Sequence, residues 1–287
     1  MRLLTYERDG HYRSGARLDD GRILDLNGAD ASVPSDMRAL LAAGEPALNA
    51  ARRAAGSPND VNCLNAGDVR VTQPVHDPEK IICIGLNYAD HAAESGMAIP
   101  KEPVVFSKFA TTLIGPGDTI ELPPESSEVD YEVELVAVIG KGGRRITEAD
   151  AMSHIAGYTI GHDVSARDYQ LNKSAGQWLL GKTFDTFAPL GPDIVTADEV
   201  DDPHNLGIRC ILNGETMQDS STSQLIFNLD VLVSYLSHVI TLSPGDLIFT
   251  GTPPGVGMGR DPKVWLKPGD TVACEIDGLG RLENPIK

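Results

Sequence analysis

The sequence has no long hydrophobic run. None of its apolar stretches approaches the roughly 20 residues that a membrane-spanning helix requires. Basic residues are also scarce, because 24 lysines and arginines stand against 41 acidic residues and leave a net charge of −17. Nucleic acids and anionic membranes are bound through clusters of lysine and arginine, so this balance argues against both as partners. An anionic substrate would need a local positive centre, which a bound metal ion could supply.

Cysteine is rare and unpaired along the chain. Cys63, Cys83, Cys210 and Cys274 form no C-x-x-C motif, which argues against a zinc site and predicts reduced, mostly buried thiols. The first ten residues contain an acidic residue and a turn signal, so they resemble neither a signal peptide nor an arginine-rich transit sequence. Together these features predict a cytoplasmic protein.

The chain of 287 residues is long enough for a main domain with a smaller appendage. Residues 1–26 predict a small β-meander, because Asp-Gly hairpin pairs separate their strand-like runs. An interrupted helix is expected over residues 37–55. We therefore predict a small N-terminal β/α domain over residues 1–75 and a catalytic domain over residues 76–287.

Short strands with glycine and proline between them dominate the second part of the chain. The best helix spans residues 229–240, where an apolar stripe that includes Val239 recurs at helical spacing and Ser237 faces away. Strands do not alternate regularly with helices, which disfavours a parallel doubly wound sheet. A β-rich α+β fold is the prediction.

Two glycine-containing runs superficially match nucleotide-binding motifs. Residues 176–183 fit G-x-x-x-x-G-K-T, but Trp178 and two leucines fill the loop, and a proline-containing segment follows where a helix would have to begin. Residues 255–259 lack the spacing of a dinucleotide fingerprint. We expect these later glycines to allow close backbone approach to a ligand or a neighbouring strand.

The segment VDYEVELVAVIG, residues 129–140, is the most informative part of the sequence. If it forms a strand, Glu132 and Glu134 share a face and lie only about 7 Å apart. Two glutamates at that distance repel each other unless water or a cation separates them. From this segment alone, a solvated face of an edge strand is as good an interpretation as a cation site.

A third carboxylate favours the cation site. Asp163 ends the apolar run AGYTIGHD and is followed by Arg167 and Gln170. Three carboxylates from two strands suit a hard cation such as Mg²⁺ or Mn²⁺, which keeps open positions for water and substrate. The alternative is a structural ion pair between Asp163 and Arg167.

A titratable pair follows the strand-like run IICIG. If the chain turns into a helix there, His91 and Glu94 stand three residues apart and can touch. An imidazole that a carboxylate orients is a competent general base near neutral pH. The alternative is a surface contact without a function.

Six motifs occur in order along the chain: GLNYADH with a later glutamate, EPVVFSK, DYEVELVAVIG, GHDVSARDYQ, GKTFDTFAPLGP and GDLIFTGTPPGVG. From about residue 80 to residue 287, this order of motifs resembles the fumarylacetoacetate hydrolase superfamily. The resemblance is strongest to the fumarylacetoacetate-hydrolase-domain-containing type-two proteins, some of which are described as oxaloacetate tautomerases. The resemblance implies a mixed β-sandwich roll, a homodimer and often a small N-terminal β domain.

The resemblance also implies roles for individual residues. Glu132, Glu134 and Asp163 match the Mg²⁺ or Mn²⁺ ligands of the family, and His91 with Glu94 matches its catalytic dyad.

Three further residues match positions that face the substrate. Lys182 resembles the lysine opposite the metal-bound substrate, with a plain surface lysine as the alternative. Gln170 and Thr252 resemble substrate-positioning residues, although the Thr252 hydroxyl could instead cap its own loop. Fumarylacetoacetate hydrolases proper place an additional aspartate ligand where this chain has residues 84–86, which favours the acylpyruvate and oxaloacetate branch.

The implied function is that of a divalent-metal-dependent enzyme acting on small 2-oxo and 2,4-dioxo acids through an enolate. Hydrolysis of a C–C bond in acylpyruvate-like or fumarylacetoacetate-like substrates is the leading expectation. Keto–enol tautomerisation or decarboxylation of oxaloacetate is the alternative, because all three reactions need the same residues. A non-catalytic carboxylate-binding protein is the rival from another class.

Overall fold

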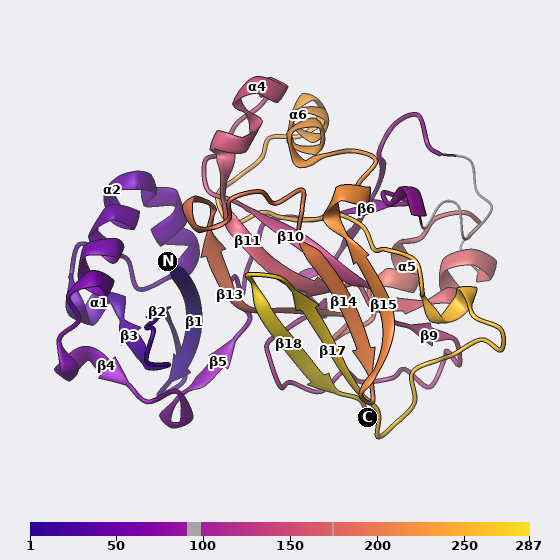
Figure 1. Ribbon diagram of the computed structural model, residues 1–287, viewed down its shortest axis with the longest axis horizontal. Coiled ribbons are helices and arrows are strands. Elements are labelled where there is room, and N and C mark those ends of the chain that lie inside the picture. The colour runs from indigo at the N-terminus through magenta and orange to yellow at the C-terminus, as the bar shows by residue number, and fades with distance from the viewer. Residues whose placement is uncertain (91–98, 174) are drawn as a thin grey trace.

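A computed structural model describes residues 1–90, 99–173 and 175–287. Within these ranges the chain is rich in strands, as the sequence predicts (Figure 1). The N-terminal strands and helices form a lobe on the left of Figure 1, and the later strands form a larger body on the right. In the described part of the chain, no helix is long and apolar enough to cross a membrane.

One mixed sheet of 12 strands runs through both parts, in the order β4-β3-β2-β1-β13-β11-β10-β16-β6-β7, with β5 beside β1 and β8 beside β13. Most neighbours are antiparallel, and β16 with β6 and β13 with β8 are parallel. The strands are β1 Arg2–Arg8, β2 His11–Arg17, β3 Ile23–Asp25, β4 Cys63–Leu64, β5 Arg70–Thr72, β6 Ile81–Gly85, β7 Val104–Lys108, β8 Leu113–Ile114, β10 Val133–Ile139, β11 Ile155–His162, β13 Ala188–Thr196 and β16 Leu247–Phe249.

A second sheet of four strands, in the order β15-β14-β17-β18, and a short pair, β12-β9, complete the strands of the described residues. These strands are β9 Val129–Asp130, β12 Ser165–Ala166, β14 Gly207–Leu212, β15 Glu215–Ser221, β17 Thr271–Ile276 and β18 Gly280–Pro285. The helices are α1 Leu26–Ala29, α2 Met37–Gly56, α4 Glu148–Ala151, α5 Leu179–Lys182 and α6 Leu229–Val239, with a π-helical turn at Asp168–Lys173.

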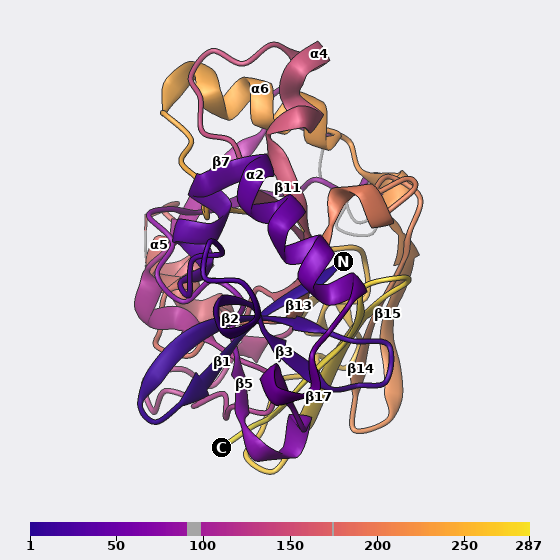
Figure 2. The same cartoon turned by 90° about the vertical axis from the view of Figure 1, so that its left-hand side faces the viewer.

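Strand β10 shows how the main sheet is covered on both faces. Leu135 and Ala137 pack into a core with residues of the four-stranded sheet and α6. Val136 and Val138, which point the other way, pack into a second core with residues of α2. A strand that is buried on both faces has a continuous run of apolar residues in its sequence, as the later part of β10 has. In Figure 2, α2 lies nearest the viewer, in front of the strands.

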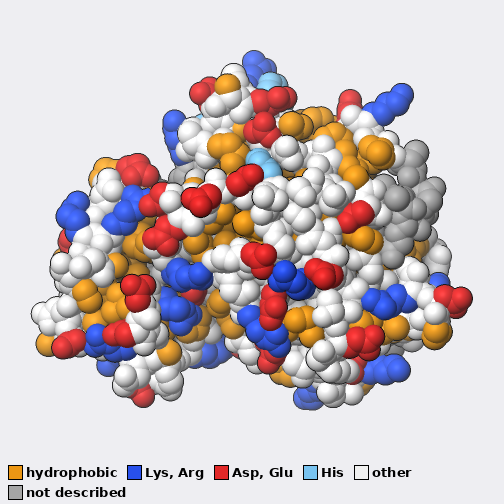
Figure 3. Space-filling model, viewed as in Figure 1, with side chains coloured by type: hydrophobic (Ala, Val, Ile, Leu, Met, Phe, Trp, Pro, Cys, Tyr) orange, Lys and Arg blue, Asp and Glu red, His pale blue; other side chains and the backbone are white. Residues whose placement is uncertain are grey.

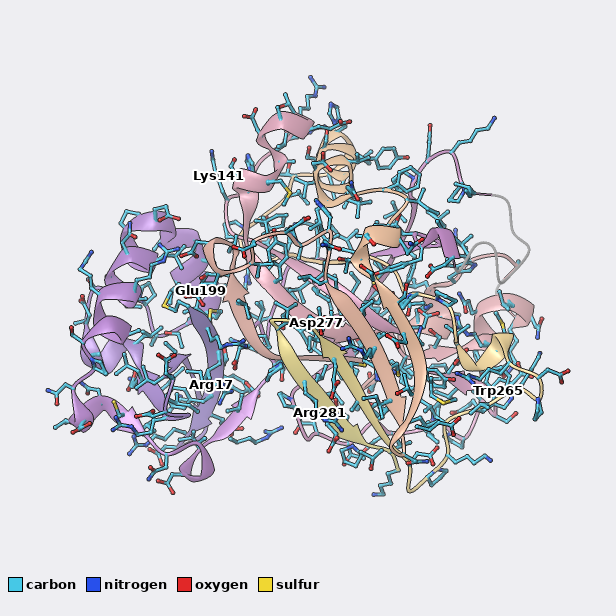
Figure 4. All side chains as sticks on the ribbon, in the orientation of Figure 1. Arg17, Lys141, Glu199, Trp265, Asp277 and Arg281 are labelled. Carbon is cyan, nitrogen blue, oxygen red and sulfur yellow. The ribbon has the colours of Figure 1, made fainter. Side chains whose placement is uncertain are left out.

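The hairpin turn and the interrupted helix expected near the N-terminus both form. Asp9 and Gly10 both have positive φ, 54° and 76°, as an Asp-Gly hairpin turn requires. Helix α2 is interrupted at Gly44, whose φ is 66°. The lobe joins the larger body where β1 pairs with β13 and where Arg17 forms a bidentate pair with Asp193, with both N–O distances below 3 Å (Figure 4). The domain boundary near residue 75 stays a prediction.

The prediction for helix α6 needs correction. Val239 was assigned to its apolar stripe but is 72% exposed, whereas Ser237, assigned to the outer face, is fully buried. The Ser237 hydroxyl accepts a hydrogen bond from the backbone N–H of Ile146 at 2.8 Å. A buried backbone N–H needs a hydrogen-bond acceptor. Ser237 supplies this acceptor to Ile146, so a polar side chain lies on the packed face of α6.

Charge is distributed over the surface in mixed pairs. On the face in Figure 3, acidic and basic side chains are interspersed, and the salt bridges Arg281–Glu275 and Arg209–Asp277 (labelled in part in Figure 4) connect neighbouring strands there. On this face, the acidic residues therefore do not form a patch of one sign.

Candidate functional site

The candidate site lies where β10 begins and β11 ends. These strands are antiparallel, with Val133 opposite His162, so the residues that flank them come together. The backbone N–H of Asp163 donates to the carbonyl of Glu132 at 2.9 Å and extends the ladder past both strands. The sheet thus brings residues about 30 positions apart in sequence to one place.

The carboxylates of Glu132, Glu134 and Asp163 meet there. Each offers one oxygen, and these oxygens all lie within 4.8 Å of one another. The three residues are only 6%, 1% and 0% exposed. This burial excludes the interpretation of Glu132 and Glu134 as a solvated strand face.

Two lysines hold Asp163 from opposite sides. Lys182 Nζ lies 2.9 Å from Asp163 Oδ2 and 2.7 Å from Glu132 Oε2. Lys108 Nζ lies 2.7 Å from Asp163 Oδ1 and also donates to the backbone carbonyls of Val164 and Phe187. Lys182 is 2% exposed, so it is not a surface lysine.

The alternative pairing of Asp163 with Arg167 is not the one that the structure forms. Arg167 Nε lies 2.8 Å from Asp130 Oδ2, and its terminal nitrogen lies 2.7 Å from Glu132 Oε1. Asp130 does not join the carboxylate cluster, because its oxygens accept from Arg167 and from the backbone N–H groups of Gly257 and Met258.

Burial and neighbouring charge move the pKa values of the two glutamates in opposite directions. Burial, and then the charges of Asp163 and Glu132, raise the pKa of Glu134 well above its usual range. Burial also acts to raise the pKa of Glu132, but the charges of Lys182 and Arg167 outweigh it and lower that pKa to about 2. Of the two glutamates, Glu134 therefore has less compensating positive charge.

These features fit a divalent cation. Three buried carboxylates supply the oxygen donors that hard cations prefer. Burial, and then the charges of Asp163 and Glu132, raise the pKa of Glu134, and a cation would favour its charged form against both effects. Lysine and arginine side chains pair with Glu132 and Asp163, whereas Glu134 accepts a hydrogen bond from the backbone N–H of Gly251 at 2.8 Å.

A cavity of about 110 Å³ opens onto these carboxylates. Charged and polar side chains line one part of it and apolar side chains line the rest: Ile84, Gly85, Leu86, Phe106, Glu132, Glu134, Arg167, Gln170, Leu171, Trp178, Lys182, Thr252 and Met258. The predicted residues Lys182, Gln170 and Thr252 therefore share one cavity with two of the predicted metal ligands.

Two of these predicted residues are tied to the framework of the site. Gln170 Oε1 accepts a hydrogen bond from Arg167 at 2.9 Å. The hydroxyl of Thr252 donates to the carbonyl of Val133 at 2.8 Å, so it binds the neighbouring strand instead of capping its own loop. Gln218 donates in turn to the Thr252 hydroxyl at 2.8 Å.

The predicted dyad, His91 and Glu94, lies outside the described residues. Its roles stay predictions from the sequence.

Sequence reasoning missed Lys108 and assigned no role to Trp178. Lys108 closes the strand-like run PVVFSK, and a lysine at the end of an apolar strand was a usable signal. The glycine run was interpreted correctly, since a Cβ on Gly257 would lie 1.8 Å from the carbonyl oxygen of Val264 and one on Gly255 would lie 2.2 Å from that of Met217.

Among known proteins, oxaloacetate tautomerase fahd2, mitochondrial, of Xenopus laevis is 53% identical over 289 residues, which cover 100% of this chain and 90% of that protein. Relatives from Bos taurus and Homo sapiens carry "mitochondrial" in their names as well. The prediction of a cytoplasmic protein is therefore wrong. Its premise was weak, because reduced cysteines indicate the redox state of a compartment and do not say which compartment it is.

Solved structures with the same fold carry names of hydrolases and isomerases. A fumarylacetoacetate hydrolase from Exiguobacterium antarcticum has a TM-score of 0.86 at 34% identity, covering 100% of this chain and 99% of that one. A 5-carboxymethyl-2-hydroxymuconate delta-isomerase from Mycobacterium smegmatis has a TM-score of 0.78 at 36% identity, covering 100% and 98%. Residues 80–287 match the family described as fumarylacetoacetate (FAA) hydrolase, C-terminal. The chain is thus an enzyme of the fumarylacetoacetate hydrolase family.

Proposed function

We propose that this protein interconverts the enol and keto forms of oxaloacetate at a divalent cation, Mg²⁺ or Mn²⁺, held by Glu132, Glu134 and Asp163. The observation that carries the proposal is the buried carboxylate cluster beside Lys182, with a cavity of about 110 Å³ that opens onto Glu132, Glu134 and Lys182. The substrate comes from the relatives, since the one from Xenopus laevis is named as an oxaloacetate tautomerase and matches the whole of this chain.

Glu132, Glu134 and Asp163 would hold the cation through one oxygen each. When bound, the cation supplies the positive charge that polarises a 2-oxo group and stabilises an enolate. Burial and the charges of Asp163 and Glu132 raise the pKa of Glu134 in spite of the opposing charge of Lys182, and a bound cation would oppose this rise. The cation therefore has a structural reason to bind as well as a chemical one.

Lys182 would supply the second positive contact to the substrate. The charges of Asp163 and Glu132 outweigh the effect of burial and raise the pKa of Lys182, so its ammonium stays protonated at neutral pH. A protonated amine at the wall of a small cavity favours the negative charge that develops on the enolate oxygen. Gln170, which lines the same cavity, would orient the substrate carboxylate through its amide group. Thr252 would position the substrate through the cavity wall that its hydrogen bond to Val133 fixes.

His91, with Glu94 orienting it, would move the proton. In the enol-to-keto direction the enol O–H is lost and a C–H bond forms at C3, so no atom is gained or lost. A single general base that faces both positions suffices for this transfer.

Hydrolysis of acylpyruvates is the second candidate. The observation that favours it is the apolar part of the cavity, where Leu86, Phe106 and Met258 would accept an uncharged acyl group more readily than a second carboxylate. In that reaction His91 would deprotonate a water that attacks the distal carbonyl, and the C–C bond would break with the enolate as leaving group. Decarboxylation of oxaloacetate would use the same residues.

The experiment follows enol absorbance and pyruvate release together, with oxaloacetate and with acetopyruvate, in the wild type and in His91→Ala. We expect enol loss from oxaloacetate without pyruvate release, and at least a 100-fold slower rate in the variant, as general acid–base catalysis contributes about that much. Pyruvate release at the rate of enol loss would show that the enzyme is a hydrolase or decarboxylase instead of a tautomerase. An absence of turnover with every oxo acid would remove the enzymatic proposal.

We also propose that the protein is a homodimer. Strand β7 ends the main sheet, and its neighbourhood exposes Val105 (46%) and Phe109 (53%). An exposed edge with apolar side chains is a surface that a second chain can cover. Light scattering on the wild type and on Phe109→Glu tests this: we expect a dimer that the substitution weakens, and a monomeric wild type would contradict it.

A further inference from the structure

The run that superficially matches a phosphate-binding loop has a different place in the structure. From residues 176–183, Trp178 just before α5 and Lys182 at its end line the candidate-site cavity. The backbone of Trp178 is already helical, with φ −80° and ψ −20°. Residues four apart on a helix share a face, so the indole and the ammonium point into the same cavity.

The indole of Trp178 sits on a glycine at the end of β6. A Cβ built on Gly85 would lie 2.2 Å from Cζ3 of the ring, so any side chain at that position would displace it. The edge of the indole also packs against Phe106, with ring centroids 5.5 Å apart and planes at 66°. Phe106 in turn lies 5.1 Å from Lys182 Nζ. Two fixed contacts therefore hold the indole beside the charged group that the proposed substrate would meet.

The cavity has a charged part and an apolar part. Glu132, Glu134, Arg167 and Lys182 supply its charged part, and the apolar part includes Trp178. A volume of about 110 Å³ corresponds to roughly four water molecules at about 30 Å³ each. If the oxo-acid end of a substrate occupies the charged part, little room remains between it and the indole.

We propose that Trp178 is a specificity-determining residue, which limits the size of the group that the substrate carries beyond its 2-oxo acid end. This inference rests on the proposed function and adds to it the residue that selects among oxo acids. The indole selects by its bulk and its fixed position, whereas the carboxylates and Lys182 treat all 2-oxo acids alike.

The test compares kcat/KM for the enols of oxaloacetate, acetopyruvate and benzoylpyruvate in the wild type and in Trp178→Ala. Pockets discriminate by about tenfold or more for a difference of one or two carbon atoms. We therefore expect the ratio of benzoylpyruvate to oxaloacetate to rise at least about tenfold in the variant. An unchanged ratio would overturn the inference. Trp265→Ala is the matched control, since this surface tryptophan near Lys263 lies outside the cavity (Figure 4).

A double-mutant cycle tests the contact that fixes the indole. Gly85→Ala should lower kcat/KM in the wild-type background, because the added methyl group displaces the ring into the cavity. The same substitution should have little effect when Trp178 is already alanine. Equal effects in both backgrounds would show that Gly85 acts independently of Trp178.

A binding measurement separates failure of this inference from failure of the proposed function. The chain has two tryptophans, so Trp265→Phe leaves Trp178 as the only one and makes its fluorescence specific. We expect oxalate with Mn²⁺, a planar mimic of a 2-oxo acid enolate, to change that emission. If the wild type converts no oxo acid, the proposed function fails, and this titration then tests the inference by itself. A change in tryptophan emission supports Trp178 as a wall of the ligand site. An unchanged emission overturns the inference.

Discussion

Replacing Glu134 with glutamine should stabilise the protein when no metal is bound and should remove its stabilisation by metal. Glutamine keeps the shape of the side chain and can still accept the hydrogen bond from Gly251. It removes only the charge. Most substitutions of buried, hydrogen-bonded residues destabilise a protein, so a gain in stability would be an unusual and informative result.

The magnitude follows from the geometry of the cluster. Like unit charges 4.8 Å apart repel by roughly 3.5 kcal/mol at an effective dielectric constant of about 20. Glu134 faces Glu132 and Asp163, but Lys182 and Lys108 offset part of that repulsion. We therefore expect Glu134→Gln to raise the free energy of unfolding of the metal-free protein by about 2 kcal/mol.

The pH dependence has a definite sign. The folded-state pKa of Glu134 is raised, so the folded state binds a proton more readily than the unfolded state does. Wild-type stability should therefore rise as the pH falls from the raised folded-state pKa of Glu134 toward the pKa of an unfolded glutamate, and the advantage of the glutamine variant should shrink over the same range.

The assay is urea unfolding with a chelator and with Mn²⁺, for the wild type and Glu134→Gln. Mn²⁺ at 100 times its dissociation constant should stabilise the wild type by about 2.7 kcal/mol and the variant by much less. A metal-free variant less stable than the wild type, or equal stabilisation of both proteins by Mn²⁺, would refute the electrostatic reasoning.

Three further predictions concern Lys182, the buried His162 and helix α6. Lys182→Met should lower kcat/KM by about 100-fold, because an electrostatic contact to the enolate is lost. The far-UV circular dichroism spectrum should stay unchanged. A loss below tenfold would contradict the role of Lys182 in stabilising the enolate. Burial lowers the pKa of His162 to about 3, so the folded state excludes a proton that the unfolded state takes up below about pH 6.5. Relative to His162→Phe, the wild type should therefore lose up to about 1.4 kcal/mol of stability per pH unit below that value, measured by urea unfolding; parallel pH profiles would count against it. Ser237→Ala leaves the Ile146 N–H without its partner and should cost about 1–3 kcal/mol by the same assay, with the exposed Val239→Ala as a near-neutral control.

Much of the fold follows from local pattern. The hairpin at Asp9-Gly10, the break in α2 at Gly44 and the doubly buried strand β10 each depend on short-range rules that the sequence displays directly. Strand β13 was missed, because Pro189 and Pro192 within Ala188–Thr196 are signals against a strand. Tertiary pairing on both sides overrides them.

The carboxylate cluster was predictable from spacing together with the ordered motifs, but its electrostatic surroundings were not. Lys108 and Asp163 are 55 positions apart, and only the pairing of β6 with β16 and β7 brings this lysine under the site. Likewise, the ion pairs of Arg167 with Asp130 and Glu132 depend on where the chain turns after β11. The packing of Trp178 on Gly85 is invisible in a one-dimensional pattern, because the two are 93 positions apart.

A titration of the metal-free protein with Mn²⁺, followed by calorimetry or by the resonance of free Mn²⁺, tests the central claim most directly. The account predicts one tight site per chain in the wild type, lost in Asp163→Asn. It predicts that the site survives in Asp36→Asn, a change in the more exposed cluster of Asp36, His76 and Asp77. Tight binding that survives Asp163→Asn, or that disappears with Asp36→Asn, would contradict a cation site at the buried carboxylates.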